Sequence, residues 1–185
     1  MKQLVLFIVG LSLAVQAYAL DISAEYGHIQ PKVKNVQSSN YVGASIVAPI
    51  NESVSGGIEV LASRLVIESD GYEIGVLSVM PIMGVTKVTA KINDKLTVYA
   101  SGASGVIVSS VNENNELTDY GIKIEAKPAL CSRVGVGAEY NVSKDIVVTA
   151  SVSRFTGEVE LSTGGNTEDF DLSSWLFGGS VILRF

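Results

Sequence analysis

Side chains that could perform catalysis are scarce in this chain, which contains one histidine and one cysteine among 185 residues. A serine or cysteine nucleophile needs a nearby base, and histidine is the usual one. His28 stands in the segment His28-Ile29-Gln30, with no serine directly after it, and Cys131 has no histidine near it in the sequence. We therefore expect no catalytic residue and no cofactor, with His28 at an interface and Cys131 as a buried free thiol.

Carboxylates are more abundant, and many of them gather late in the chain. The segment 157–174 is predicted to be an acidic surface loop containing Glu158, Glu160, Glu168, Asp169 and Asp171. Such oxygens suit hard cations, but their spacing matches no defined calcium site, so we expect a solvated acidic surface and no metal. The whole chain has 13 Lys and Arg against 19 Asp and Glu, a net charge of −6. This charge argues against binding nucleic acid through bulk electrostatics.

The first 19 residues have the order of a secretory signal peptide. Lys2 gives a positive start, an apolar run follows, and Ala17 and Ala19 form a small-residue cleavage site before Leu20. We expect residues 1–19 to be removed and residues 20–185 to form one domain. A single cysteine allows no disulfide within the chain, and no later segment is long and apolar enough for a transmembrane helix.

The remaining sequence alternates with a period of two, which is typical of β-strands. We predict eight strands, at about 20–29, 40–49, 54–64, 77–91, 96–110, 119–140, 146–156 and 175–185. The connections between them alternate between short turns (50–53, 92–95 and 141–145) and longer loops (30–39, 65–76, 111–118 and 157–174). Short turns on one side and long loops on the other are typical of an up-and-down barrel in a membrane. The predicted fold class is therefore all-β, an eight-stranded antiparallel transmembrane β-barrel.

Three residues interrupt this regular pattern. Pro81 and Pro128 lack the N–H donor of a strand ladder, so each predicts a bulge or another strand irregularity. Phe155 falls out of phase with the apolar face of its strand, and a bulge could bring it back into phase.

The last strand indicates which way the apolar face points. Its alternate positions are large and apolar, at Trp175, Phe177, Val181, Leu183 and Phe185. Ten residue steps at a tilt of about 40° rise about 25 Å, the height of the apolar band of an outer-membrane barrel. We therefore expect this face to meet lipid and the strand to close the barrel against the first strand.

With the apolar face outward, the charged residues between the apolar positions point into the lumen. The predicted lumen charges are Glu25, Glu59, Lys87, Lys123, Glu125, Arg133, Glu139 and Arg184, with Lys127 beside them. Eight strands enclose only enough space for side chains, so we expect a salt-bridged plug. A small gated conductance is the alternative.

The C-terminal strand ending in Phe185 resembles the assembly signal of outer-membrane β-barrels. The segments VMPIMGVTKVTAKINDKLTVYASGASGV and VGVGAEYNVSKDIVVTASVSRFTG are similar to hairpins of the small eight-stranded outer-membrane family. That family holds opacity-type adhesins, virulence-associated barrels and the transmembrane domain of outer-membrane protein A. The chain departs from it at Ser153-Arg154-Phe155, where two aromatics are usual.

The resemblance implies a bacterial outer-membrane location, with long loops outside the cell and short turns in the periplasm. It implies contact with outer-membrane lipid and lipopolysaccharide, insertion by the barrel-assembly machinery, a host or matrix surface ligand, and a monomer. The expected role is non-enzymatic: displaying loops for adhesion or surface interaction, or maintaining the envelope. A narrow solute or ion pore is the alternative, followed by a lipid A-modifying enzyme, which the lone His28 disfavours. A soluble lipocalin-like carrier is disfavoured by the missing N-terminal Gly-x-Trp.

Overall fold

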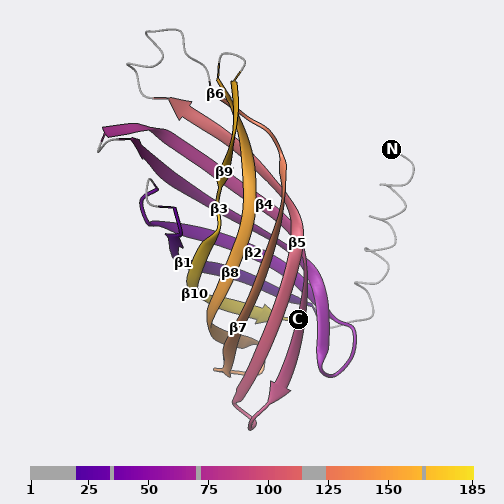
Figure 1. The fold of residues 1–185 in the computed structure, drawn as a ribbon. Helices are drawn as coiled ribbons and strands as arrows, with labels where there is room; N and C mark the ends of the chain where they lie inside the picture. The colour runs from indigo at the N-terminus through magenta and orange to yellow at the C-terminus, as the bar shows by residue number, and fades with distance from the viewer. Residues whose placement is uncertain (1–19, 34–35, 70–71, 114–123, 164–165) are drawn as a thin grey trace, which may run out of the picture.

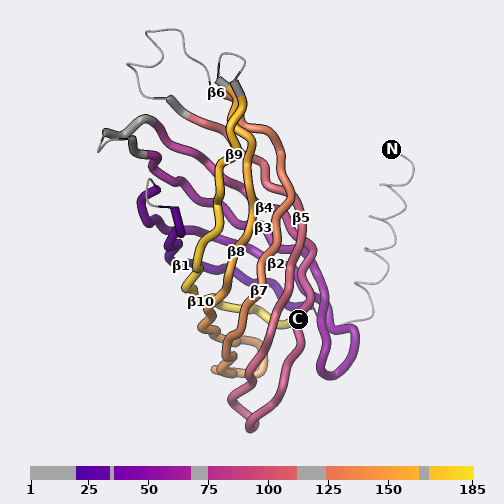
Figure 2. Tube along the Cα trace, in the orientation of Figure 1, coloured from indigo at the N-terminus to yellow at the C-terminus, as the bar shows by residue number. Residues whose placement is uncertain are grey.

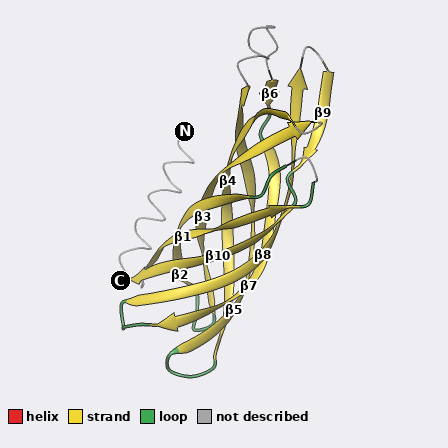
Figure 3. Ribbon diagram, turned by 90° about the vertical axis from the view of Figure 1, so that its left-hand side faces the viewer, coloured by secondary structure: helices red, strands yellow, loops and turns green. Residues whose placement is uncertain are grey.

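The structure is a computed structural model that describes residues 20–33, 36–69, 72–113, 124–163 and 166–185. All regular structure in these ranges is β-strand (Figures 1 and 3). The strands are β1 (Asp21–Pro31), β2 (Ser39–Pro49), β3 (Val54–Ser69), β4 (Tyr72–Lys91), β5 (Leu96–Glu113), β6 (Ile124–Ala126), β7 (Ala129–Asn141), β8 (Ile146–Thr163), β9 (Asn166–Asp171) and β10 (Ser174–Arg184). Within the described ranges, no helix is long and apolar enough to cross a bilayer.

Eight of these strands close into an antiparallel barrel in the order β10-β1-β2-β3-β4-β5-β7-β8, and β8 pairs with β10 to complete the ring. Following paired residues once around the ring from Asp21 returns to β1 at Pro31, ten residues further along. This stagger tilts the strands against the barrel axis, as Figure 2 shows, and closure of a twisted sheet requires such a tilt. The predicted eight-stranded barrel is confirmed.

The apolar face of the strands lies outside, as predicted. Among the exposed side chains are Ile46 (52%), Val136 (56%) and Val181 (49%), whereas Tyr41 (1%) and Met83 (1%) alternate with such positions and are buried. A water-soluble barrel would bury its apolar face, so this outer surface is suited to lipid. The C-terminal strand contributes Trp175, Phe177, Val181, Leu183 and Phe185 to it, all exposed.

The three short turns lie together at one end of the barrel, called here the turn end; the other end is the loop end (Figure 1). In each turn, one side-chain oxygen accepts hydrogen bonds from the backbone N–H groups two and three residues further on. These acceptors are Asn51, Asn93 and Ser143. The residue before each acceptor is aliphatic and exposed: Ile50, Ile92 and Val142. These side chains extend the apolar outer face into the turns.

At the loop end, the strands continue well past the predicted boundaries. The range 65–76 was expected to be a loop, but β3 and β4 remain paired up to Ser69 and Tyr72. The prediction of a loop at 157–174 is also wrong, because β8 continues to Thr163 and forms a hairpin with β9. The apolar alternation ends at the edge of the lipid-facing band, but backbone pairing does not need an apolar face to continue.

The three irregular residues have different outcomes. The predicted strand 119–140 is broken at Pro128 into β6 and β7, as a missing N–H would cause. At Pro81 the register is unchanged, although pairing with β3 is not formed at Leu61 and Ala62. Phe155 needs no bulge, because it faces inward and is buried (6% exposed).

Candidate functional site

Arg133 on β7 is the centre of an ion-pair network inside the barrel. Its guanidinium donates to Glu25 Oε1 at 2.9 Å, to Glu59 Oε2 at 3.4 Å and to Ser153 Oγ at 2.8 Å. The hydroxyl of Tyr41 donates to the same Glu25 oxygen at 2.6 Å. The Arg133 side chain is 8% exposed, and the ion-pair residues line a polar cavity of about 80 Å³, which has room for several waters.

A second group of charges lies nearer the turn end. Lys87 Nζ is 2.6 Å from Glu139 Oε1, and Arg184 Nε is 3.1 Å from Asp21 Oδ1. Arg184 also lies 3.9 Å from the other oxygen of Glu139, which links the two pairs. Lys87 Nζ is in addition 5.4 Å from the centre of the Tyr99 ring. Paired charges from four strands therefore cross the lumen at this level.

The structure brings six of the eight predicted lumen charges into these two groups: Glu25, Glu59, Lys87, Arg133, Glu139 and Arg184. Glu125 was placed wrongly: it is exposed on β6, which pairs with β8 beyond the barrel. Lys127 is also exposed and pairs with Glu160. Lys123 lies outside the described residues. Asp21 and Tyr41 also belong to these groups and were not predicted, although strand alternation places both on the inner face.

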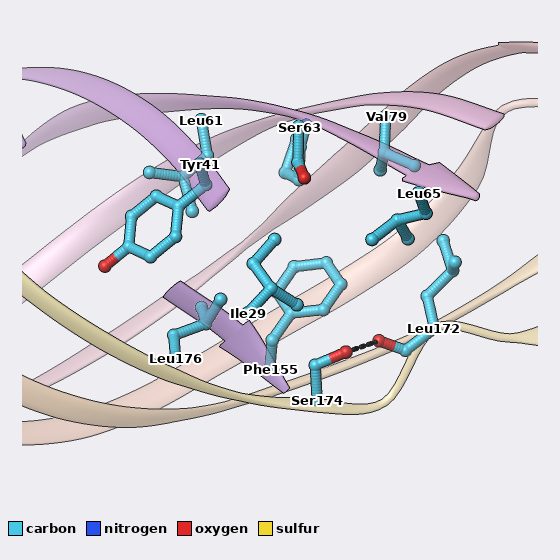
Figure 4. Close-up of a pocket in the computed structure, with 11 residues that line it drawn as sticks. Ile29, Tyr41, Leu61, Ser63, Leu65, Val79, Phe155, Leu172, Ser174 and Leu176 are labelled. Atoms are coloured by element: carbon cyan, nitrogen blue, oxygen red, sulfur yellow. Dashed lines mark hydrogen bonds between the residues drawn. The ribbon is translucent and has the colours of Figure 1, made fainter. Parts of the chain in front are cut away.

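On the loop-end side of the Arg133 network, the lumen contains an apolar cavity, and Figure 4 shows its lining. A cavity of about 30 Å³ at this level has a mostly aliphatic and aromatic lining that includes Ile29, Tyr41, Leu65, Phe155, Leu172 and Leu176. One water needs about 10–15 Å³ of such space and also needs polar partners. In this lining Ser174 Oγ is already bonded to the Leu172 carbonyl at 2.7 Å. The packed apolar layer and the ion pairs together fill most of the lumen at these levels.

The barrel carries a raised sheet at its loop end, formed by β6, β8 and β9 (Figures 1 and 3). The lower part of β8 belongs to the barrel, and its upper part pairs with β6 on one side and β9 on the other. Val159 is fully buried on the inner face of this sheet, and Leu161 and Phe170 pack against the core. The sheet is therefore a folded extension of the barrel.

The predicted acidic residues lie on this raised sheet, and four of the five lie opposite one another across β8 and β9, whereas Glu168 lies opposite Leu161. In the strand register Glu158 lies opposite Asp171, and Glu160 lies opposite Asp169. The side chains of Glu158, Glu168 and Asp169 are exposed. Hydrogen bonding by the Ser173 side chain lowers the pKa of Asp171, and the Ser173 N–H, Lys32 and Arg154 act in the same direction. The described ranges contain no group of three or more His, Cys, Asp or Glu residues arranged to hold a metal ion.

The remaining predicted positions lie apart from these groups. His28 is exposed on the outer face, where Nδ1 lies 3.3 Å from Asn40 Oδ1. Cys131 is a free, buried cysteine. Ala17 and Ala19 lie outside the described residues, and Leu20 exchanges backbone hydrogen bonds with Phe185.

Solved structures with the same architecture include outer membrane protein W of E. coli, with a TM-score of 0.59 and 17% identity over 91% of this chain and 98% of that chain. Neisserial surface protein A gives a TM-score of 0.65 with 11% identity over 91% and 97% of the two chains. The chain has the fold of a small outer-membrane β-barrel. The Yersinia pestis protein Ail, in complex with the heparin analogue sucrose octasulfate, matches this barrel with a TM-score of 0.51 and 12% identity over 89% and 97%. No family model matches the sequence, and no curated protein does.

Proposed function

We propose that this protein is a non-enzymatic outer-membrane barrel that presents its raised sheet on the cell surface for contact with another surface. The turn end would face the periplasm and the loop end the exterior, after removal of residues 1–19. The C-terminal strand from Trp175 to Phe185 would be read by the barrel-assembly machinery, and the barrel would act as a monomer. One observation carries the proposal: a closed, edge-free barrel supports an ordered sheet that rises above its apolar band.

The raised sheet is suited to contact because its core fixes its shape and its acidic groups remain in water. Val159 anchors the inner face, and Glu158, Glu168 and Asp169 are exposed. Loops and extensions on a rigid scaffold commonly carry binding functions. The partner would be a host or matrix surface; a role in envelope integrity would require no such partner.

Shortening the raised sheet is expected to abolish binding to that surface. Cells that express the protein would be tested on matrix proteins and epithelial cells. In the variant, residues 159–170 are replaced by a two-residue turn, which leaves Leu172 and Ser174 in the barrel. Binding should appear with the full chain and disappear with the variant at equal surface amounts.

A second variant tests whether binding depends on the charges of the raised sheet or on its shape. Neutralising the exposed carboxylates by Glu158→Gln, Glu168→Gln and Asp169→Asn keeps the sheet, and the matched control neutralises Glu52, Asp94 and Asp145 at the turn end. We expect the first triple variant to weaken binding and the control to leave it unchanged. Equal binding by the shortened variant and the full chain would reject surface contact through this sheet and favour an envelope role.

The pore alternative makes the opposite prediction for ion flow. Because paired charges and an apolar layer fill the lumen, we expect no steady single-channel current when the protein is inserted in a planar bilayer. The measurement is single-channel recording at increasing voltage, with an empty bilayer and a wide porin as references. Reproducible current steps that depend on the amount of protein would support the narrow pore.

A further inference from the structure

The charges of the two ion-pair groups inside the barrel do not cancel. In the group nearer the turn end, the basic side chains of Lys87 and Arg184 balance the two carboxylates that they contact. In the other group, the single guanidinium of Arg133 faces two carboxylates, Glu25 and Glu59. Four carboxylates therefore stand against three basic side chains, and the one excess negative charge lies beside Arg133.

This excess charge is least compensated at Glu59. Glu25 receives a hydrogen bond from Arg133 at 2.9 Å and another from Tyr41 at 2.6 Å. Glu59 receives only a longer contact from Arg133, at 3.4 Å to Oε2. Its other oxygen, Oε1, is buried and has no hydrogen-bond partner among the residues that the structure describes. Because Glu59 is only 8% exposed, leaving this oxygen without a partner is costly, and a donor or a cation would remove the cost.

Glu59 lines the polar cavity of about 80 Å³, whose wall is rich in oxygen atoms. The hydroxyl groups of this wall belong to Ser23, Ser45, Ser101, Thr149, Ser151 and Ser180, besides the phenol of Tyr99. Ser45 lies directly opposite Glu59 in the register of β2 and β3, and its Oγ is 2.8 Å from Ser23 Oγ. Oxygen atoms are the ligands that hard cations take, and the cavity has room for an ion with several waters.

The size of the imbalance indicates the charge of such an ion. A monovalent cation would cancel the single excess charge, whereas a divalent one would leave an uncompensated positive charge in a largely buried space. The described residues also contain no group of three or more His, Cys, Asp or Glu arranged to hold a metal ion, which a divalent cation would favour. A proton on Glu59 would cancel the charge too, but the new O–H group would then need an acceptor of its own.

A polar route leads to this cavity from the turn end. A larger cavity, of about 670 Å³, is lined by residues of the first short turn, including Asn51 and Ser53. Lys87 and Glu139 line both cavities, so their ion pair stands between the two. On the loop-end side the lumen is apolar. A cation would therefore reach Glu59 from the turn end alone.

We propose that the polar cavity beside Glu59 binds one monovalent inorganic cation, such as Na⁺ or K⁺, through Glu59 Oε1 and Ser45 Oγ, with water completing its shell. The bound ion would stabilise the folded barrel, because the unfolded chain brings no such set of oxygen atoms together. The site lies inside the barrel and does not depend on the proposed contact function of the raised sheet.

The test compares the stability of the barrel in Na⁺ with its stability in N-methyl-D-glucamine, a cation too large for the cavity, at equal ionic strength. The barrel is folded in phosphatidylcholine vesicles and unfolded in urea, and the only tryptophan of the chain, Trp175, reports unfolding by its fluorescence. We expect Na⁺ to lower the unfolding equilibrium constant of the parent protein, by about tenfold at ten times the dissociation constant of the ion. K⁺ should act in the same direction.

Two variants and a control connect this response to the site. Glu59→Gln removes the charge with little change of shape and should abolish the response to Na⁺. Glu158→Gln, at an exposed position of the raised sheet, is the matched control and should keep it. Ser45→Ala retains the carboxylate and should need several times more Na⁺ for the same stabilisation, so it tests the site even if Glu59→Gln fails to fold. Independently, anomalous scattering from crystals grown in Tl⁺ should locate one ion beside Glu59.

Equal stability of the parent protein in Na⁺ and in N-methyl-D-glucamine would overturn the proposal, as would a Na⁺ response that persists in Glu59→Gln. Stability that changes with pH but not with Na⁺ would assign the compensating charge to a proton and reject the ion. A stronger response to Ca²⁺ than to Na⁺ at equal concentration would reject a monovalent ion. Tl⁺ found only outside the lumen would reject the location.

Discussion

Replacing Arg133 with leucine is expected to lower the free energy of unfolding by about 3–5 kcal/mol, the range for breaking a buried ion pair by removing one partner. Glu25 and Glu59 both point at this guanidinium, at 2.9 Å and 3.4 Å, and both are largely buried. Without it, two carboxylates face each other across a small, largely buried polar cavity with Tyr41 as the remaining donor. Because the leucine side chain fills part of the space, the decrease in the free energy of unfolding should come mainly from the loss of the positive charge.

The measurement is equilibrium unfolding in urea, with the barrel folded in lipid vesicles and followed by Trp175 fluorescence. A triple variant, Arg133→Leu with Glu25→Gln and Glu59→Gln, removes all three charges and should regain most of the lost stability. Lys144→Leu, at an exposed turn position, is the surface control. If Arg133→Leu unfolds at the same urea concentration as the parent protein, water in the cavity must hydrate the two carboxylates as well as the guanidinium pairs them, which would contradict the prediction.

Alternation along the strands was sufficient to predict the barrel and the direction of most side chains. A period of two places Ile46 and Ser45 on opposite faces of the sheet, and likewise Val136 and Arg133. Closure of the sheet then makes one face the outer surface, suited to lipid, and the other the lining of a narrow lumen. The short turns were also predictable, because Asn, Asp and Ser mark them and each turn contains a side-chain acceptor. These features depend on local sequence alone.

The contents of the lumen depended on contacts between distant strands. Arg133 and Glu25 are 108 residues apart in sequence, and no local pattern indicates that they meet. Phe155 looked out of phase because an outward aromatic was expected, but the narrow lumen needs a large apolar side chain at that level. The raised sheet was missed for a similar reason, because β9 is a polar, acidic strand that pairing with β8 stabilises.

Replacing Gly105 with alanine is expected to destabilise the barrel by about 2–3 kcal/mol, as overpacking in a closely packed region does. Gly105 lies on β5 opposite Met83, where β4 and β5 approach closely. A Cβ atom at this glycine would lie 2.0 Å from the Ile82 carbonyl oxygen and 2.7 Å from the Met83 Cα. Both contacts are with backbone, so a side-chain rotation cannot relieve them and the strands must move apart.

Gly102, three residues earlier on the same strand, is the matched control. It faces outward, and a Cβ atom there would have no heavy atom within 4 Å. Gly102→Ala should therefore leave stability unchanged or raise it by up to about 1 kcal/mol, because alanine restricts the unfolded chain more than glycine does. Both variants would be compared by urea unfolding in the same vesicles. Equal stability of the two would mean that β4 and β5 can separate at no cost, and a closed ring of eight strands with a fixed stagger does not allow that.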